Sequence, residues 1–255
     1  MPPDRSYLVC ATPRSGSTLV CHALDETGIA GRPEEYFEAL RHSGRPRRPE
    51  EYFIGVDDKS IFDQLGERNL GDDPRPRSPY WSRTAYDRYV EWAVETGTTP
   101  NGVFAAKIMW SHTDDLWRRL QGRRLEDVFG ELRYVQVIRR DKIAQAVSLW
   151  TAIQTQAWRD GDPIQREPVY SAAAIGHLVE WLKRGEDAWT TWLAGRGADV
   201  VVYEDFARDP SPTIEILAGV AAPPPPIRRQ SGPRSNGWTL RYEAELGETT
   251  RDAAA

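Results

Sequence analysis

The sequence predicts an α/β protein whose central parallel sheet is flanked by helices. Short apolar runs at residues 7–11, 103–110, 132–138 and 199–203 alternate with longer segments of helical spacing. Several runs are apolar at nearly every position, as expected for parallel strands covered on both faces. Ligands of such sheets bind beyond the carboxyl ends of the strands, so the residues after each run are the first candidates for a site.

The first run ends in a turn rich in small and hydroxyl residues. The chain breaks at Pro13 and Gly16, and helical spacing begins at Ser17. A strand, a short turn and a helix together direct backbone N–H groups and the positive end of a helix at one anion. The turn therefore predicts a phosphate cradle, with an ordinary turn capped by Ser17 as the alternative. The candidate residues are Pro13, Arg14, Ser15, Gly16, Ser17 and Thr18.

This cradle departs from the nucleotide-binding pattern G-x-x-x-x-G-K-[ST]. With Gly16 on the second glycine, Ala11 replaces the first glycine and Ser17 replaces the lysine that would reach a triphosphate. An ordinary ATPase or kinase is therefore disfavoured. Arg14 can supply the missing charge, because its fork suits a phosphate or sulfate.

The third run predicts a second anion site. It delivers Arg139 and Arg140 at its carboxyl end, and Ser148 follows on the predicted helix 142–158. Surface charge or a salt bridge to Asp141 is the alternative. Two anion sites at one sheet edge indicate a ligand with two separated phosphate groups.

Further helices are predicted at 86–94, 112–120, 172–193 and 210–220, with a helical patch near 57–65. We expect one domain, 1–255, with an insertion or loop region at 41–80 between the first two core strand–helix units and a C-terminal tail at 227–255. The basic, proline-rich stretch 41–49 is expected to be an exposed loop, with a lid over the substrate as the alternative.

The composition limits the partners. A net charge of −5 gives no general attraction to nucleic acid or anionic membranes. No apolar run is long enough to span a membrane, and the N-terminus lacks the apolar core of a signal peptide. Cys10 and Cys21 lie in apolar context and are expected to be buried free thiols in a cytoplasmic protein. The four histidines lack metal-ligand spacing, so no metal site is expected.

Several blocks resemble a known enzyme family. T-P-R-S-G-S-T resembles the 5′-phosphosulfate loop of sulfotransferases that use 3′-phosphoadenosine-5′-phosphosulfate (PAPS), and R-R-D-K-I-A-Q-A-V-S resembles their 3′-phosphate site. Four blocks in order resemble the Stf0 family over about residues 7–160. They are L-V-C-A-T-P-R-S-G-S-T-L, G-I-A-G-R-P-E-E-Y-F, N-G-V-F-A-A-K-I-M-W and Q-A-V-S-L-W-T-A-I-Q-T-Q-A-W.

The resemblance implies the P-loop-like sulfotransferase fold, PAPS as donor and 3′-phosphoadenosine 5′-phosphate (PAP) as product. It makes the turn at 13–18 the donor loop. It puts Arg140 and Ser148 at the 3′-phosphate, a role that Arg139 could share. It places Glu35 as the base for the acceptor hydroxyl, with Glu34 as its neighbouring rival. It also makes a homodimer plausible.

Lys107, inside the second run, is a candidate to stabilise charge on the leaving oxygen, with a solvent-directed lysine as the alternative. Glu34, Tyr36, Phe37 and Trp110 are candidates for the acceptor site, and the three aromatic residues could instead belong to the core. The acceptor implied is a hydroxyl of a sugar or glycoside, trehalose among them. The insertion or loop region at 41–80 is expected to lie near this acceptor site. The competing hypotheses are a metal-dependent phosphotransferase and a nucleotide sensor without catalysis.

Overall fold

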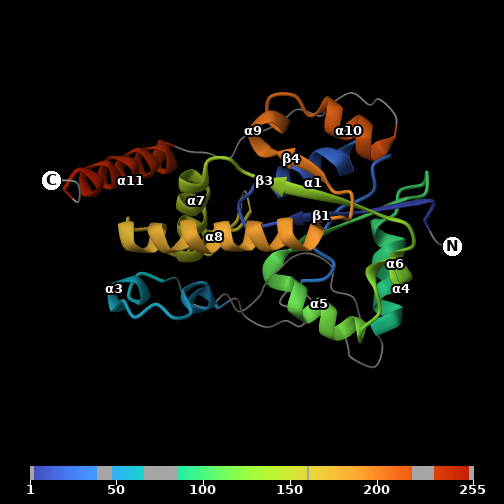
Figure 1. Ribbon diagram of the computed structural model, residues 1–255, viewed down its shortest axis with the longest axis horizontal. Coiled ribbons are helices and arrows are strands. Elements are labelled where there is room, and N and C mark those ends of the chain that lie inside the picture. Colours follow the sequence, from blue (N-terminus) through green and yellow to red (C-terminus); the bar gives the residue numbers. More distant parts are fainter. Residues whose placement is uncertain (1–2, 39–47, 66–85, 160, 220–232, 253–255) are drawn as a thin grey trace. The chain divides into compact units, whose positions relative to one another are not determined.

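The computed structural model of the protein describes residues 3–38, 48–65, 86–159, 161–219 and 233–252 (Figure 1). The described residues form two compact units. Unit 1 contains 3–38, 86–140 and 185–219, and unit 2 contains 48–65, 141–159, 161–184 and 233–252. The boundary falls within the helix α8 (Ala172–Leu193).

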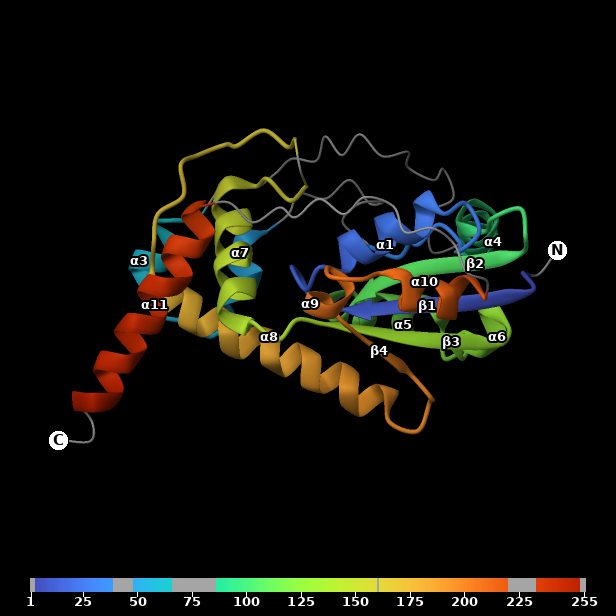
Figure 2. The same ribbon diagram turned by 90° about the horizontal axis from the view of Figure 1, so that it is seen from above.

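Unit 1 is built on a four-stranded sheet. Its strands are β1 (Arg5–Ala11), β2 (Val103–Met109), β3 (Leu132–Ile138) and β4 (Asp199–Val202). Their order is β2-β1-β3-β4, and all neighbours pair in parallel, with Val9 opposite both Lys107 and Val135. Figure 2 shows β1, β2 and β3 running in one direction. The predicted parallel sheet and its four strands are confirmed.

Helices cover both faces of this sheet, as the apolar runs require. Tyr7 and Val9 pack with α1 (Ser17–Glu26), α9 (Tyr203–Phe206) and α10 (Ser211–Ala218). Leu8 and Cys10 point to the other face. They pack there with α4 (Tyr86–Gly97), α5 (Thr113–Leu120), α6 (Leu125–Phe129) and the end of α8. A short 3₁₀ helix, η2 (Trp110–His112), joins β2 to α5. The strict alternation along β1 divides the core into two layers.

Unit 2 is helical. It contains η1 (Pro49–Phe53), α3 (Lys59–Phe62), α7 (Lys142–Thr155), the first part of α8, and α11 (Pro233–Asp252). Its core is formed around Phe53, Trp150 and Leu178, with Tyr242 packing from α11. Within the part of the chain that the structure describes, no helix is both long and apolar enough to cross a lipid bilayer.

Some boundaries differ from the sequence predictions. The helix predicted to reach residue 158 ends at Thr155, because Gln156 has a left-handed φ of 55° and the Asp162 carboxylate accepts the N–H of Trp158 at 2.8 Å. The short helices α6 and α9 were not predicted. Residues 41–47 and 66–80 of the predicted insertion lie outside the described residues, and 48–65 hold η1 and α3. The predicted tail at 227–255 contains α11.

The two cysteines are free, and both are buried in unit 1. Burial raises the pKa of both thiols, to about 12 for Cys21. The prediction of buried free thiols is confirmed.

Candidate active site

The turn after β1 has the backbone of an anion cradle. Arg14 and Gly16 have left-handed φ values of 60° and 89°, and Gly16, not Ser17, is the N-cap of α1. No side chain caps this helix, so the alternative with Ser17 as N-cap is wrong. The first N–H groups of a helix have no partner within it and are free to face an anion.

Ser15 supports the same interpretation. Its side chain is fully buried in the turn, and its Oγ has no hydrogen-bond partner among the described residues. An unsatisfied buried hydroxyl costs stability unless a ligand or water completes it. The turn therefore contains a polar atom that a phosphate or sulfate oxygen could satisfy.

Lys107 joins this turn to Glu35. It lies within β2 with only 4% of its side chain exposed. Its Nζ is 2.7 Å from Oε1 of Glu35, and it donates a hydrogen bond to Oγ1 of Thr18 at 3.1 Å. The structure thus brings three predicted residues together, and Lys107 is not a lysine directed to solvent.

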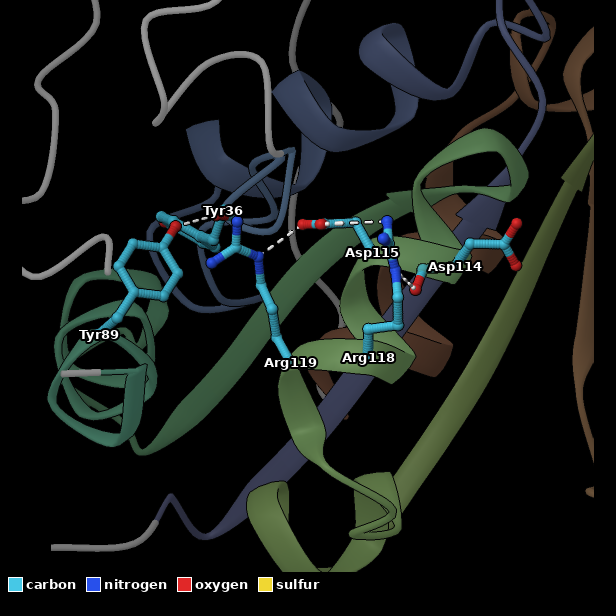
Figure 3. Close-up of polar contacts among 6 residues, drawn as sticks. All are labelled: Tyr36, Tyr89, Asp114, Asp115, Arg118 and Arg119. Atoms are coloured by element: carbon cyan, nitrogen blue, oxygen red, sulfur yellow. Dashed lines mark hydrogen bonds and ion pairs between the residues drawn. The ribbon is translucent and has the colours of Figure 1, made fainter. Parts of the chain in front are cut away.

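The sheet edge fixes the position of Glu35. Its neighbour Glu34 forms a parallel bridge with Ala106, and the Lys107 N–H donates to the Glu34 carbonyl at 2.9 Å. The Tyr89 hydroxyl from α4 donates to the Tyr36 carbonyl on the other side (Figure 3). The segment around Glu35 is therefore held by the backbone of β2 and by α4.

The charges around Lys107 favour its ammonium form. Burial alone lowers the pKa of Lys107. Its electrostatic interactions with Glu35, Cys21 and Glu34, and its hydrogen bond to Glu35, together raise the pKa above its ordinary value. The buried lysine is therefore a cation at neutral pH.

The aromatic candidates differ in their placement. Tyr36 and Phe37 are buried at 3% and 1% exposure, and the Tyr36 hydroxyl donates to the Arg32 carbonyl at 2.9 Å. Both pack in the core layer that contains Tyr89, which favours the core alternative for them. Trp110 is half-buried at the carboxyl end of β2, edge-to-face with Trp189 at 5.1 Å.

The two arginines after β3 face different partners. Arg139 donates from Nη1 to the Arg14 carbonyl at 3.4 Å, so it approaches the cradle. Arg140 is more than half exposed and makes a forked pair with Asp205, at 3.0 and 2.5 Å. Arg140 thus forms a salt bridge with Asp205, whereas the Asp141 carboxylate caps α7 by accepting the Ala144 N–H.

Ser148 lies in unit 2, half-buried on α7, whereas Arg139 and Arg140 close unit 1. Its predicted role at a 3′-phosphate stays a prediction.

Tyr203, at the start of α9, was not predicted from the sequence. Its ring packs against Gly16, and the Arg139 guanidinium lies 5.1 Å from the ring centre. Tyr203 directly follows the strand β4, so the rule that sites form beyond strand ends could have indicated it.

A separate cavity of about 310 Å³ lies between α4 and α5. The described residues that line it are Tyr86, Asp115, Arg118, Arg119 and Gln121. Figure 3 shows the Arg119 guanidinium turned toward Asp115, with Nε 2.6 Å from Oδ2. Arg118 reaches the same carboxylate at 3.5 Å. None of the predicted site residues lines this cavity. Among the described side chains, no group of three or more His, Cys, Asp or Glu could hold a metal ion.

Comparisons with known proteins identify the family of this chain. The family profile described as Stf0 sulphotransferase matches residues 6–245. A trehalose 2-sulfotransferase of Mycobacterium tuberculosis (strain ATCC 35801 / TMC 107 / Erdman) is 37% identical over 262 residues, covering 94% of this chain and 95% of the relative. A trehalose 2-sulfotransferase of Mycolicibacterium smegmatis is 30% identical, with the same coverage.

A solved sulfotransferase domain from the curacin biosynthetic pathway has a TM-score of 0.45 and 13% identity, covering 92% of this chain and 82% of that domain. The profile match over most of the chain and the 37% identity to the first relative establish the family of this protein. The chain belongs to the Stf0 sulphotransferase family, and it is a sulfotransferase. The resemblance stated from the sequence blocks is confirmed.

Proposed function

We propose that this sulfotransferase transfers the sulfuryl group of PAPS to a hydroxyl of trehalose or a closely similar sugar. One observation carries the proposal. The buried cation Lys107 contacts both the anion cradle, through Thr18, and the carboxylate of Glu35. Such a group lies where a donor anion and an acceptor hydroxyl would meet.

The cradle fits the donor. The buried Oγ of Ser15, the helix start at Gly16 and the guanidinium of Arg14 suit the 5′-phosphosulfate. PAPS supplies an activated sulfuryl group whose departure leaves the anion PAP. The cradle lacks the lysine of triphosphate-binding loops, and PAPS has no γ-phosphate for such a lysine to reach.

We assign the 3′-phosphate to Arg140 with Ser148, and Arg139 is the alternative to Arg140. The exposed fork of Arg140 already binds one anion, the Asp205 carboxylate, with geometry that suits a phosphate. Arg139 contacts the cradle directly, because its Nη1 donates a hydrogen bond to the Arg14 carbonyl. Both arginines follow the strand adjacent to β1, so both lie at the edge where the donor loop is formed.

Glu35 and Lys107 would divide the chemistry between them. The acceptor oxygen forms a bond to sulfur while the bridging S–O bond breaks, and the acceptor proton passes to the Glu35 carboxylate. The Lys107 ammonium stabilises the negative charge that grows on the bridging oxygen. Sulfuryl transfer depends mainly on such positioning and charge stabilisation. An ion pair between the two residues holds both in place before the substrates arrive.

The two relatives named trehalose 2-sulfotransferases support a trehalose-like acceptor. Trp110 is the aromatic candidate that stays at the end of a strand with part of its ring exposed. We propose Trp110 as a surface for a sugar ring. Glu34 is half-buried beside Glu35 and is retained as a polar contact for the acceptor, whereas burial of Tyr36 and Phe37 favours a supporting role for them.

One assay tests the proposal. The protein is incubated with ³⁵S-labelled PAPS and trehalose, glucose, maltose or sucrose, with EDTA present. We expect label on trehalose that does not depend on metal. Absence of label on every sugar would contradict the proposal, and ATP turnover abolished by EDTA would support a phosphotransferase. PAP binding without any transfer would support a nucleotide sensor.

We also propose that residues 1–255 form a single functional domain, and that the protein is a homodimer with a cytoplasmic location. Light scattering coupled to size-exclusion chromatography tests the homodimer, and cell fractionation tests the location.

A further inference from the structure

Tyr203 stands at the carboxyl end of β4, on the same edge as the donor loop. β4 pairs in parallel with β3, which pairs in parallel with β1, so all three strands end at this edge. The short helix α9 begins with Tyr203 and is anchored by Phe206, which is 2% exposed in the core layer of α1. The ring is therefore carried by a fixed element.

The Tyr203 ring lies directly against the backbone of Gly16. A Cβ placed on Gly16 would be 2.1 Å from Cδ2 of Tyr203 and 2.8 Å from its Cγ. Such distances are far below van der Waals contact, so only glycine fits beneath the ring. The left-handed φ of 89° at Gly16 also favours glycine. The ring thus packs on the residue where the cradle turns into α1.

The same ring supports Arg139. The Arg139 guanidinium carbon lies 5.1 Å from the ring centre, within the range of a cation–π contact. Its Nη1 reaches the carbonyl of Arg14 in the cradle. The ring therefore contacts two separate parts of the proposed donor site.

The residues after Tyr203 hold the next arginine. The Arg140 N–H donates to Oε2 of Glu204 at 3.1 Å, and its guanidinium forks onto Asp205. Three consecutive residues of α9 thus orient both arginines that follow β3. Such support by neighbouring side chains is what keeps a binding group in its productive geometry.

We infer that Tyr203 is a positioning residue of the donor site: its ring fixes the cradle at Gly16 and directs Arg139 toward it. The inference rests on the proposed function, because it takes the cradle as the PAPS site. It adds α9 as a third element of the donor site, beside the loop after β1 and the end of β3.

The test compares Tyr203→Leu, which removes the ring, with Tyr203→Phe, which keeps it. PAP affinity is measured by calorimetry, and KM for PAPS, KM for trehalose and kcat are measured by label transfer. We expect Tyr203→Leu to weaken PAP binding and raise KM for PAPS by about tenfold, the effect of one lost stacking contact, without changing KM for trehalose. Tyr203→Phe should restore affinity to within about twofold, because the ring supplies the contact.

Tyr170→Leu is the matched control. Tyr170 also carries a stacked arginine, Arg241, with the guanidinium carbon 3.8 Å from the ring centre, but both residues belong to unit 2. PAP affinity should be unchanged in this variant. Equal PAP affinity of Tyr203→Leu and wild type, or equal losses in both leucine variants, would overturn the inference.

A measurement on the unmodified protein covers the case in which Tyr203→Leu does not fold. Hydrogen exchange with and without PAP should show protection of residues 203–206 together with the cradle. Protection of the cradle alone would overturn the inference. Failure of the wild type to bind PAP would instead contradict the proposed function, and the inference with it.

Discussion

The ammonium of Lys107 and the carboxylate of Glu35 form a buried ion pair 2.7 Å long at the edge of the sheet. Their side chains are 4% and 14% exposed. Isolated buried charges are strongly disfavoured, so each group depends on the other. The pair joins the segment around Glu35 to the turn after β1, because Lys107 also contacts Thr18.

Replacing Glu35 should separate catalysis from donor binding. In Glu35→Gln the proposed base is lost, and we expect kcat to fall by about 100-fold or more while PAP affinity is retained. Calorimetry and label transfer measure the two effects. Glu34→Gln tests the neighbouring rival. A severe loss of turnover in Glu34→Gln with near-normal turnover in Glu35→Gln would contradict the assignment.

Replacing Lys107 should destabilise the protein because Glu35 loses its partner. We expect Lys107→Met to lower the free energy of unfolding by about 3 to 5 kcal/mol in urea denaturation. The double variant Lys107→Met/Glu35→Gln should recover much of that loss, since no buried charge remains unpaired. Additive losses in the double variant would show that the two groups do not interact energetically.

The same pair predicts a pH dependence. The folded pKa of Lys107 is raised above its ordinary value of 10.5, so its contribution to stability is fully present below that value. The contribution is lost as pH rises through the folded pKa. The stability difference between wild type and Lys107→Met should therefore be constant from pH 7 to about pH 10 and shrink at higher pH. A difference that already falls between pH 7 and 9 would argue against the raised pKa.

Gly16 and Gly28 offer a matched pair of substitutions. Both have a left-handed φ, 89° and 67°, but a Cβ at Gly16 meets Tyr203 while nothing lies within 4 Å of one at Gly28. Gly28→Ala should cost about 1 kcal/mol of stability, from backbone strain alone. Gly16→Ala should cost more and should also weaken PAP binding, as measured by urea denaturation and calorimetry. Equal effects of the two variants would mean that the Tyr203 side chain moves away from the added methyl group at little cost.

Arg140→Ala should weaken PAP binding by about tenfold or more, because a charge-assisted fork to phosphate is lost. Arg139→Ala, measured in parallel by calorimetry, decides which arginine contributes more. Arg208→Ala serves as the control, since Arg208 is also an exposed neighbour of Asp205, at 3.7 Å. Unchanged affinity in Arg140→Ala would remove Arg140 from the 3′-phosphate site.

The sequence predicted the sheet well because its strands are apolar runs of suitable length between helices. It also placed the cradle, Trp110 and the two arginines at one edge, because parallel strands end together. The predicted end of α7 was wrong by a few residues, because the apolar spacing of the sequence does not show that Gln156 adopts a left-handed conformation. The helix α9, four residues long, is too short to show a period.

Side-chain partners were harder to predict than elements. Nothing in the run V-F-A-A-K-I-M showed that its lysine pairs with Glu35, because that contact depends on the bridge between Glu34 and Ala106 far along the chain. The salt bridge of Arg140 with Asp205 joins residues 65 apart. Burial of Tyr36 and Phe37 likewise follows from packing against α4, which composition alone does not reveal.

The bridge at Glu34 also suggests how acceptor choice could change without loss of the donor site. Glu34 is attached to the outer strand β2 through backbone groups, which any residue at that position would provide. The proposed donor loop follows the inner strand β1 instead. Residues around Glu35 can therefore be exchanged at the edge of the sheet while the inner strand is left intact. For protein engineering, the proposed acceptor segment would then be a replaceable module beside a constant donor loop.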